Sequence, residues 1–219
     1  MNAVVIGVGG CGKNILEVVH AAGDITAKLV YVNTDRNSIE KSGIPDKILL
    51  DKLDPNYVIN KVDLDPYDKV ILVAGLGGST GTAVIPILAN VADRTGKRVY
   101  AVLTRPLPFE GTSRRTIAKD TIRKLEFPCH HTVIFHNEVL FSRMDPESHI
   151  DDMEIRIPME ANCTTGDIFN KINKYAALTI KMFAERNMPD NIYSVVLRLE
   201  RLLGKEVIVG SYGQAIDVA

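Results

Sequence analysis

The sequence predicts an α/β protein with a doubly wound, mostly parallel six-stranded sheet and a long C-terminal helix. Three observations support this fold class. Short apolar strands alternate with helical patterns along most of the 219 residues. The strands are continuous apolar runs, which is typical of parallel sheets covered on both faces. Two strands end in glycine-rich turns that open helices, and in such a fold the ligand binds at the carboxyl ends of the strands.

The predicted elements follow one another without an internal repeat or a low-complexity segment. The strands are expected at residues 3–8, 28–33, 47–50, 69–75, 98–104 and 132–137. The helices are expected at residues 12–22, 54–61, 79–95, 112–125 and 166–187. A further amphipathic helix at 192–203 precedes a short strand at 207–209, which is expected to join the sheet edge or to pair with another chain.

The composition is that of an ordinary globular protein, with 46% hydrophobic and 24% charged residues. The formal net charge is −1 and no long basic run occurs, so neither nucleic acid nor an anionic membrane is an expected partner. Three cysteines without close pairing indicate a reducing compartment. No basic leader precedes the first strand, and no apolar run approaches the roughly 18 residues that span a bilayer, so a cytoplasmic location is expected.

The first glycine-rich turn, Gly7-Val-Gly-Gly-Cys-Gly-Lys-Asn14, satisfies more than one nucleotide-binding motif. It fits the dinucleotide fingerprint G-x-G-x-x-G and most of the phosphate-loop motif, except that Asn14 replaces the hydroxyl that ligates magnesium. Glycines allow close approach of the main chain, and the helix N-terminus favours an anion. Cys11 lies at that N-terminus, where its pKa is expected to fall. Alone, this turn is compatible with a nucleotide site, a dinucleotide site or tight packing.

The second turn, Gly75-Leu-Gly-Gly-Ser-Thr-Gly-Thr82, favours one nucleotide whose whole phosphate chain is held by the backbone. An oxidoreductase that uses NAD(P) holds its pyrophosphate at the first turn and has no need of a second. Small residues with hydroxyls at the start of a helix provide a second nest of main-chain N–H groups for an anion. We therefore expect both turns to contact one triphosphate, with an NAD(P)-binding oxidoreductase as the alternative.

The second turn resembles the signature GGGTGT[GS] of the tubulin and FtsZ superfamily. The segment Thr104-Arg-Pro-Leu-Pro-Phe-Glu-Gly111 is similar to the TKPFxFEG segment of FtsZ, and Asp167 falls where the family begins its long central helix. The resemblance covers most of residues 3–187. It implies a GTP-binding domain at 1–187, which includes the central helix, and a remnant of the family's second domain at 188–219.

The resemblance implies GTP or GDP, bound with Mg²⁺, as the ligand of this site. Asp167 is implied to read guanine, because a carboxylate matches the adjacent N1–H and N2–H₂ donors in a contact worth about 1.5–3 kcal/mol. Glu110 is implied to bind the ribose hydroxyls, Arg114 to contact the ribose or a phosphate, and Asp35 to approach the terminal phosphate through magnesium or water. Each of these four also has a structural explanation. Asp167 suits a helix N-terminus, Glu110 a solvated loop, Arg114 the exposed face of a helix and Asp35 a turn. The implied nucleotide-binding residues are Gly9, Gly10, Cys11, Gly12, Asn14, Asp35, Gly75, Gly77, Gly78, Ser79, Thr80, Gly81, Thr82, Glu110, Arg114, Asn137 and Asp167.

The sequence also departs from the family pattern. Cys163 stands where the family has a base-stacking aromatic, four residues before Asp167. The segment 51–68 has no counterpart of the loop that senses the γ-phosphate. The segment 188–194, from which the family presents acids to the nucleotide of the next subunit, contains an acid only at Asp190. Because hydrolysis needs a positioned water and charge stabilisation, we expect guanine-nucleotide binding with weak or absent GTP hydrolysis and assign no catalytic residue.

The resemblance further implies a nucleotide-dependent module for cytoskeletal or division-related partners. Residues 188–219 are expected to support a homo-oligomer, whereas ordinary head-to-tail filaments are not expected because part of the stacking surface is absent. A third alternative is a structural relative that binds no nucleotide and pairs through 192–203 and 207–209. No metal site held by the protein alone is predicted, because His130 and His131 would face opposite sides of a strand.

Overall fold

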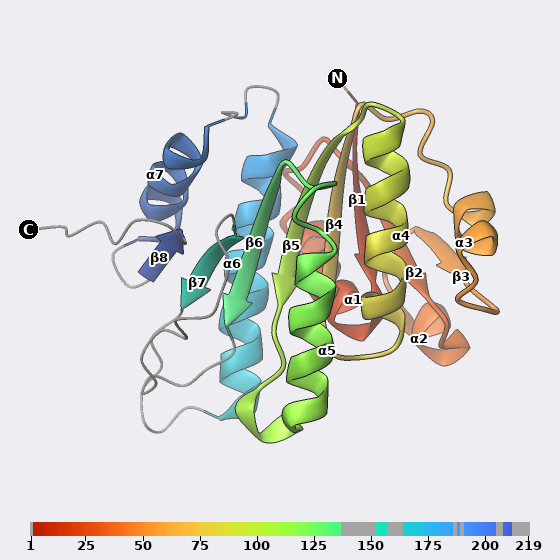
Figure 1. The fold of residues 1–219 in the computed structure, drawn as a ribbon, viewed down its shortest axis with the longest axis horizontal. Helices are drawn as coiled ribbons and strands as arrows, with labels where there is room; N and C mark the ends of the chain where they lie inside the picture. The colour runs from red at the N-terminus through yellow and green to blue at the C-terminus, as the bar shows by residue number, and fades with distance from the viewer. Residues whose placement is uncertain are drawn as a thin grey trace, which may run out of the picture.

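The computed structural model describes residues 2–136, 152–156, 164–185, 188, 191–204 and 208–211. The elements, in chain order, are β1 (Ala3–Val8), α1 (Gly9–Ala22), β2 (Lys28–Asn33), α2 (Arg36–Lys41), β3 (Asp46–Leu49), α3 (Pro55–Lys61), β4 (Lys69–Gly75), α4 (Thr80–Arg94), β5 (Arg98–Thr104), the 3-10 helix η1 (Pro108–Glu110), α5 (Thr112–Arg123), β6 (His131–His136), β7 (Asp152–Arg156), α6 (Thr165–Ala184), α7 (Ile192–Leu203) and β8 (Ile208–Ser211). Within these residues the strands form one sheet in the order β3-β2-β1-β4-β5-β6-β7-β8, with helices on both faces (Figure 1).

The sheet is parallel from β3 to β7, and β8 pairs antiparallel with β7 at its edge. The six predicted strands are present, each within one residue of its predicted bounds, so the doubly wound α/β fold is confirmed. The strand predicted at 207–209 corresponds to β8 and joins the sheet edge. β7 was not predicted, because charged residues alternate with Met153 and Ile155 in a segment that is not an unbroken apolar run.

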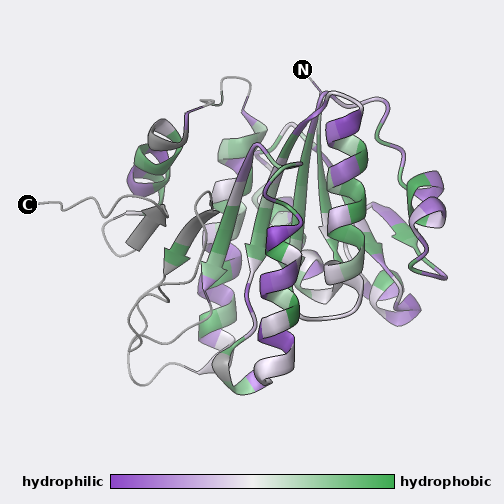
Figure 2. Ribbon diagram, viewed as in Figure 1, coloured by the Kyte–Doolittle hydropathy of each residue, from purple (hydrophilic) through white to green (hydrophobic). Residues whose placement is uncertain are grey.

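Both faces of the sheet are covered, which explains why its strands are continuous apolar runs. Residues such as Val5, Ile71 and Tyr100 are buried in one core with side chains of α1, α6 and α7. Their neighbours in sequence, such as Val4 and Leu72, are buried in a second core with side chains of α3, α4 and α5. Hydropathy colouring shows the same division, with apolar strands between helices that turn polar residues outward (Figure 2). The sheet therefore separates two apolar layers.

Local sequence explains where several helices begin. α3 starts after Asp54, whose carboxylate accepts a hydrogen bond from the Tyr57 amide at 3.0 Å, and Pro55 occupies its first turn. α1 begins at Gly9, earlier than predicted, because the turn glycines already belong to its first turn. α2 was not predicted, since its side chains include no buried residue and hence no apolar periodicity.

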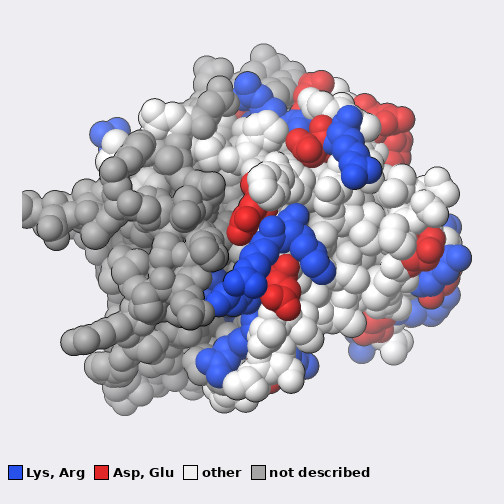
Figure 3. Space-filling view, viewed as in Figure 1, with Lys and Arg blue, Asp and Glu red and all other residues white. Residues whose placement is uncertain are grey.

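The surface that α4 and α5 present carries charges of both signs. Lysine and arginine side chains gather over α5, with acidic side chains beside them (Figure 3). Among them Arg123 lies 3.7 Å from Asp120. The expectation that nucleic acid is not a partner stays a prediction. Among the described helices, none is long and apolar enough to cross a membrane.

Candidate functional site

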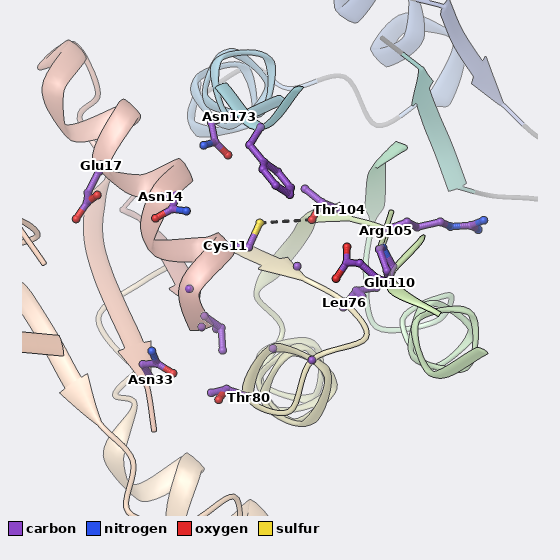
Figure 4. A pocket seen from close by; sticks show the side chains of 18 of the residues that line it. Cys11, Asn14, Glu17, Asn33, Leu76, Thr80, Thr104, Arg105, Glu110 and Asn173 are labelled. Carbon is purple, nitrogen blue, oxygen red and sulfur yellow. Dashed lines mark hydrogen bonds between the residues drawn. The ribbon is translucent and has the colours of Figure 1, made fainter. Parts of the chain in front are cut away.

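A cavity of about 860 Å³ opens at the carboxyl ends of the strands, where this fold class places a ligand. Both glycine-rich turns line it, together with the end of β2, the segment 104–114 and one face of α6 (Figure 4). The predicted nucleotide-binding residues on its lining are Gly9, Gly10, Cys11, Asn14, Gly75, Gly78, Ser79, Thr80, Gly81, Glu110 and Arg114. The fold thus brings three separate stretches of predicted residues together at one site.

The two glycine-rich turns lie side by side. The position that a Cβ atom would take on Gly9 is 3.7 Å from the amide nitrogen of Gly81 and 3.8 Å from the Cβ atom of Thr80. α1 begins at Gly9 and α4 begins at Thr80, so the N-termini of both helices open onto the cavity. Main-chain N–H groups and the positive ends of two helix dipoles therefore converge there, which suits an anion.

The glycines of these turns have two different roles. On Gly12, a Cβ atom would lie 2.7 Å from the carbonyl carbon of Gly7 and 2.8 Å from the carbonyl oxygen of Val73. Gly12 therefore allows α1 to pack closely on β1 and β4, and it does not line the cavity. Gly10 and Gly78 do line the cavity, and a Cβ atom on either would meet nothing within 4 Å. At these two positions the missing side chain leaves space for a ligand.

Gly77 and Thr82 shape the second turn without lining the cavity. Gly77 has a φ of 85°, and a Cβ atom there would lie 2.7 Å from Pro106 Cγ and 2.8 Å from the Arg114 carbonyl oxygen. Its amide donates a hydrogen bond to Thr82 Oγ1 at 3.0 Å. A glycine is required here because the turn rests directly against the next wall of the cavity.

That next wall carries Glu110 and Arg114, which contact each other. The Arg114 guanidinium donates to Glu110 Oε2 at 2.7 Å, and the Leu107 amide donates to Glu110 Oε1 at 2.7 Å. The Arg114 side chain is 55% exposed. An exposed pair with this helical spacing contributes only about 0.3–0.5 kcal/mol. A ligand can therefore compete for either partner.

The end of β2 adds a polar residue, Asn33, that is not among the predicted site residues. Asn33 is buried and lines the cavity. Its Nδ2 donates to the Tyr31 hydroxyl at 2.6 Å, and its Oδ1 accepts from the Thr34 amide at 2.8 Å. The Thr34 hydroxyl in turn lies 2.9 Å from Thr80 Oγ1, which links this loop to the second glycine turn. The available signal was a polar residue at the end of an apolar strand.

Asp35 lies outside the cavity lining. Its carboxylate accepts a hydrogen bond from the Ser38 amide at 3.3 Å and caps α2, which is the turn role that was its alternative. Neither glycine turn contributes a carboxylate, although Ser79 and Thr80 bring hydroxyls. Mg²⁺ is commonly held by a few protein oxygens together with substrate phosphates, so this donor set suits an ion held mainly by a nucleotide. Within the described residues, no three His, Cys, Asp or Glu side chains form a metal cluster.

Cys11 lines the cavity in an environment that differs from the expected one. Its Sγ lies 3.4 Å from Thr104 Oγ1. Burial raises the pKa of the Cys11 thiol, an effect that outweighs the hydrogen bond with Thr104. The expected lowering of this pKa is therefore wrong, because removal from water disfavours the thiolate more than the helix N-terminus stabilises it.

Asp167 does not belong to the cavity lining. Its Oδ2 accepts from the Thr164 amide at 2.9 Å and from the Thr164 hydroxyl at 2.6 Å, while its own amide donates to Thr164 Oγ1 at 3.2 Å. These contacts form a capping box at the start of α6. The hydrogen bonds from Thr164 lower the pKa of the Asp167 carboxyl. Of the other predicted residues, Asn137 lies outside the described residues.

The face of α6 that does line the cavity carries Phe169, Asn170 and Asn173. The resemblance put the family's base-stacking aromatic at Cys163 and its base-reading side chain four residues later, at Asp167. Phe169 and Asn173 have the same spacing, which puts both on one face of a helix. Asn173 lies at the same end of the cavity as Asn14 of α1 (Figure 4). The four-residue spacing was therefore the signal that could have found them.

The chain matches the family model for the tubulin/FtsZ family, GTPase domain, over residues 2–145. The cell division protein FtsZ of Mycoplasmopsis pulmonis is 30% identical over 159 residues, which cover 65% of this chain and 41% of that protein. The cell division protein FtsZ of Haloferax mediterranei is 30% identical over 157 residues, which cover 64% of this chain and 42% of that protein. The chain thus spans about two fifths of the length of these relatives.

Solved structures with FtsZ-like folds superpose on most of the chain. An empty FtsZ dimer from M. jannaschii gives a TM-score of 0.65 at 23% identity, covering 87% of this chain and 56% of that chain. A GDP-bound monomer of CetZ1 from Haloferax volcanii gives a TM-score of 0.62 at 16% identity, covering 91% of this chain and 64% of that chain. At these identities the similarity establishes a shared fold.

Proposed function

This chain belongs to the tubulin/FtsZ family, and from that premise we propose that it binds GTP or GDP in the cavity beside the two glycine-rich turns. The observation that carries this proposal is the meeting of the turns. The position that a Cβ atom would take on Gly9 lies 3.7 Å from the Gly81 amide nitrogen, and a Cβ atom on Gly10 or Gly78 would meet nothing within 4 Å. Backbone amides from both turns can therefore reach one phosphate chain.

The phosphate end of the proposed site is built from main chain and helix termini. Each helix N-terminus stabilises a nearby anion by about 0.3–1 kcal/mol, and by up to about 2 kcal/mol where it is partly buried. Two such termini, those of α1 and α4, open onto the cavity, and Ser79 and Thr80 add hydroxyl donors. Main-chain donors do not distinguish one base from another. Selectivity for guanine must therefore come from the opposite end.

The base end of the proposed site lies between α1 and α6. We assign stacking of the base to Phe169, and such a contact is worth about 1–3 kcal/mol. We assign the base edge to Asn173, with Asn14 facing it from α1, because an amide offers a donor and an acceptor for the neighbouring O6 and N1–H groups of guanine. Asp167 stays the alternative reader. Glu110 is proposed to bind the ribose hydroxyls, and Arg114 the ribose or a phosphate.

The remaining proposals concern turnover and assembly. Among the described residues that line the cavity, the carboxylates are Glu17 and Glu110, and the second already accepts two hydrogen bonds. In the family the acids for hydrolysis come from the next subunit, and the corresponding segment 188–194 has an acid only at Asp190, which supports weak or absent hydrolysis. Residues 1–187 are proposed to form the GTP-binding domain, and residues 188–219 to be a remnant of the family's second domain. A homo-oligomer would form through the remnant, because its strand β8 is the terminal strand of the sheet order. The protein would act as a module of the division or cytoskeletal machinery.

The test is a binding titration with fluorescent GTP, ATP and NADH on the wild-type chain and two variants. Gly78→Asp adds a carboxylate at the cavity lining, where a Cβ atom meets nothing within 4 Å, so GTP binding should be lost while the fold is kept. Gly43→Asp is the matched control, because Gly43 also has open space around its Cβ position but does not line the cavity. Equal affinity of both variants for GTP, or tighter binding of NADH than of GTP, would overturn the proposed function.

A further inference from the structure

The start of β4 carries a buried cation that no part of the proposed nucleotide site uses. Lys69 is 1% exposed. Its ammonium group donates to the carbonyl oxygens of Phe183 at 2.7 Å and Glu185 at 2.5 Å. It also lies 5.4 Å from the ring centroid of Tyr100, which stacks on the Phe183 ring at a centroid distance of 4.8 Å. Lys69 thus joins two central strands to the end of α6.

These partners explain why a lysine is tolerated there. Burial of an ammonium group is costly unless the charge is compensated, and burial lowers the pKa of Lys69. The last carbonyls of a helix lack partners within the helix and form the negative end of its dipole. The two carbonyls at the end of α6 therefore provide both the hydrogen bonds and the favourable field that Lys69 needs. The contact fixes the C-terminus of α6 on the sheet.

The other described charged contacts at this end of α6 are more exposed. Lys181 pairs with Asp24 at 2.5 Å, with side chains that are 26% and 60% exposed. Glu185 pairs with Arg198 of α7, with side chains that are 52% and 36% exposed. Solvent-exposed pairs contribute little to structure. Among these described charged groups, Lys69 is therefore the one that is buried and that binds the main chain of the helix.

β4 and α6 both extend from this contact to the cavity. β4 continues directly into Gly75, where the second glycine turn begins. α6 reaches the cavity at Phe169 and Asn173, and a helix rises 1.5 Å per residue, so the distance from Phe183 back to Asn173 is about 15 Å. A continuous helix transmits an axial shift at one end to the other. The position of α6 along β4 therefore sets the separation between the base end and the phosphate end.

We propose that Lys69 is a positioning residue for the nucleotide base: it fixes α6 along β4 and so holds Phe169 and Asn173 at the correct distance from the phosphate-binding turns. This inference rests on the proposed function. It requires that loss of the Lys69 contact weakens binding of the base while the turns still bind phosphate.

The experiment compares GTP with inorganic tripolyphosphate, which lacks the base and the ribose. In Lys69→Met the affinity for GTP should fall by about tenfold, the range of a lost base contact, while the affinity for tripolyphosphate stays unchanged. Lys181→Met is the matched control, because it removes an exposed ion pair from the same end of the same helix. Its affinity for both ligands should equal that of the wild type. If Lys69→Met lost affinity for both ligands to the same extent, the role of Lys69 would be purely structural and the inference would be overturned.

A measurement on the wild-type chain covers the case in which Lys69→Met does not fold. Coupling between two sites is reciprocal, so GTP should slow amide hydrogen exchange at the end of α6, where the Glu185 amide bonds to the Met182 carbonyl. Tripolyphosphate should not. Equal protection by both ligands, or none by GTP, would overturn the inference. If the wild type binds neither ligand, the proposed function itself fails.

Discussion

The phosphate end and the base end of the proposed site are built from different parts of the chain. Two turns form the phosphate end with their main chain, and glycine is needed wherever a side chain would fill that space, as at Gly10 and Gly78. Side chains on the facing helices α1 and α6 form the base end, among them Asn14 and Asn173. A main-chain site is therefore visible in a sequence as a glycine pattern. A side-chain site depends on the exact register of a helix.

The largest expected effect is at the phosphate end. Alanine substitutions at two glycines of the first turn should change the stability of the protein by different amounts. Gly12→Ala should lower the free energy of unfolding by about 3 kcal/mol, because the three atoms nearest the new methyl group are backbone atoms at 2.7, 2.8 and 3.0 Å. Gly10→Ala should leave it unchanged or raise it by up to about 1 kcal/mol, since alanine favours the helix. Urea denaturation measures both. Equal destabilisation by the two substitutions would remove the distinction between packing glycines and cavity glycines.

At the base end, Phe169→Ala should lower the affinity for GTP by about tenfold through loss of stacking. Tripolyphosphate should bind as before, because the turns are unchanged. Phe127→Ala is the matched control, since Phe127 is 92% exposed and does not line the cavity. Fluorescence titration measures the three proteins. A loss of tripolyphosphate affinity in Phe169→Ala would mean that the two ends do not act separately.

A smaller change in selectivity is expected from Asn173→Asp. A carboxylate accepts from both N1–H and N2–H₂ of guanine but cannot donate to it, and adenine offers it only one donor group. The ratio of GTP to ATP affinity should therefore rise by about fivefold, which corresponds to about 1 kcal/mol. Competition of ATP against labelled GTP gives the ratio. An unchanged ratio would move the base-reading role away from Asn173.

The smallest effect is expected from Asp167→Asn, which weakens the capping box of α6. The hydrogen bonds from Thr164 lower the pKa of this carboxyl below its ordinary value of 3.8. The stabilisation that the ionised Asp167 gives to the native state is therefore complete above pH 3.8, and it is lost as the pH falls through the lower pKa of the native state. Thermal unfolding of the variant and the wild type should differ slightly at pH 7 and converge in strong acid. A fall in the GTP to ATP affinity ratio by more than about threefold would instead make Asp167 the guanine reader.

The fold was predictable from the sequence because its strands are buried on both faces. Val99 to Leu103, for example, is an uninterrupted apolar run and is the interior of β5. α2 escaped prediction because it buries no side chain, and β7 because its charged residues mask the apolar ones. α2 contacts β2 and β3 at one end of the strand order, and β7 is the second strand from the other end.

The site was predictable to the extent that main chain forms it. Two helix-terminal residues show the limit. Asp167 suits both a capping box with Thr164, three residues earlier, and a base contact in sequence, and the structure shows it in the hydrogen bonds of the capping box. Cys11 was assigned a lowered pKa from its place at a helix terminus, yet its burial depends on how β5 and Thr104 pack against it. Burial and register are properties of the tertiary structure, and local patterns do not contain them.

The close packing of Gly12 also bears on how homologous sequences should be interpreted. With backbone atoms 2.7 and 2.8 Å from its Cβ position, natural selection will keep glycine there for the fold alone, whatever the protein binds. Gly10 and Gly78 are under no such steric demand. Their invariance across distant relatives would therefore record selection for the ligand, and their drift to larger residues would mark lineages that have abandoned it.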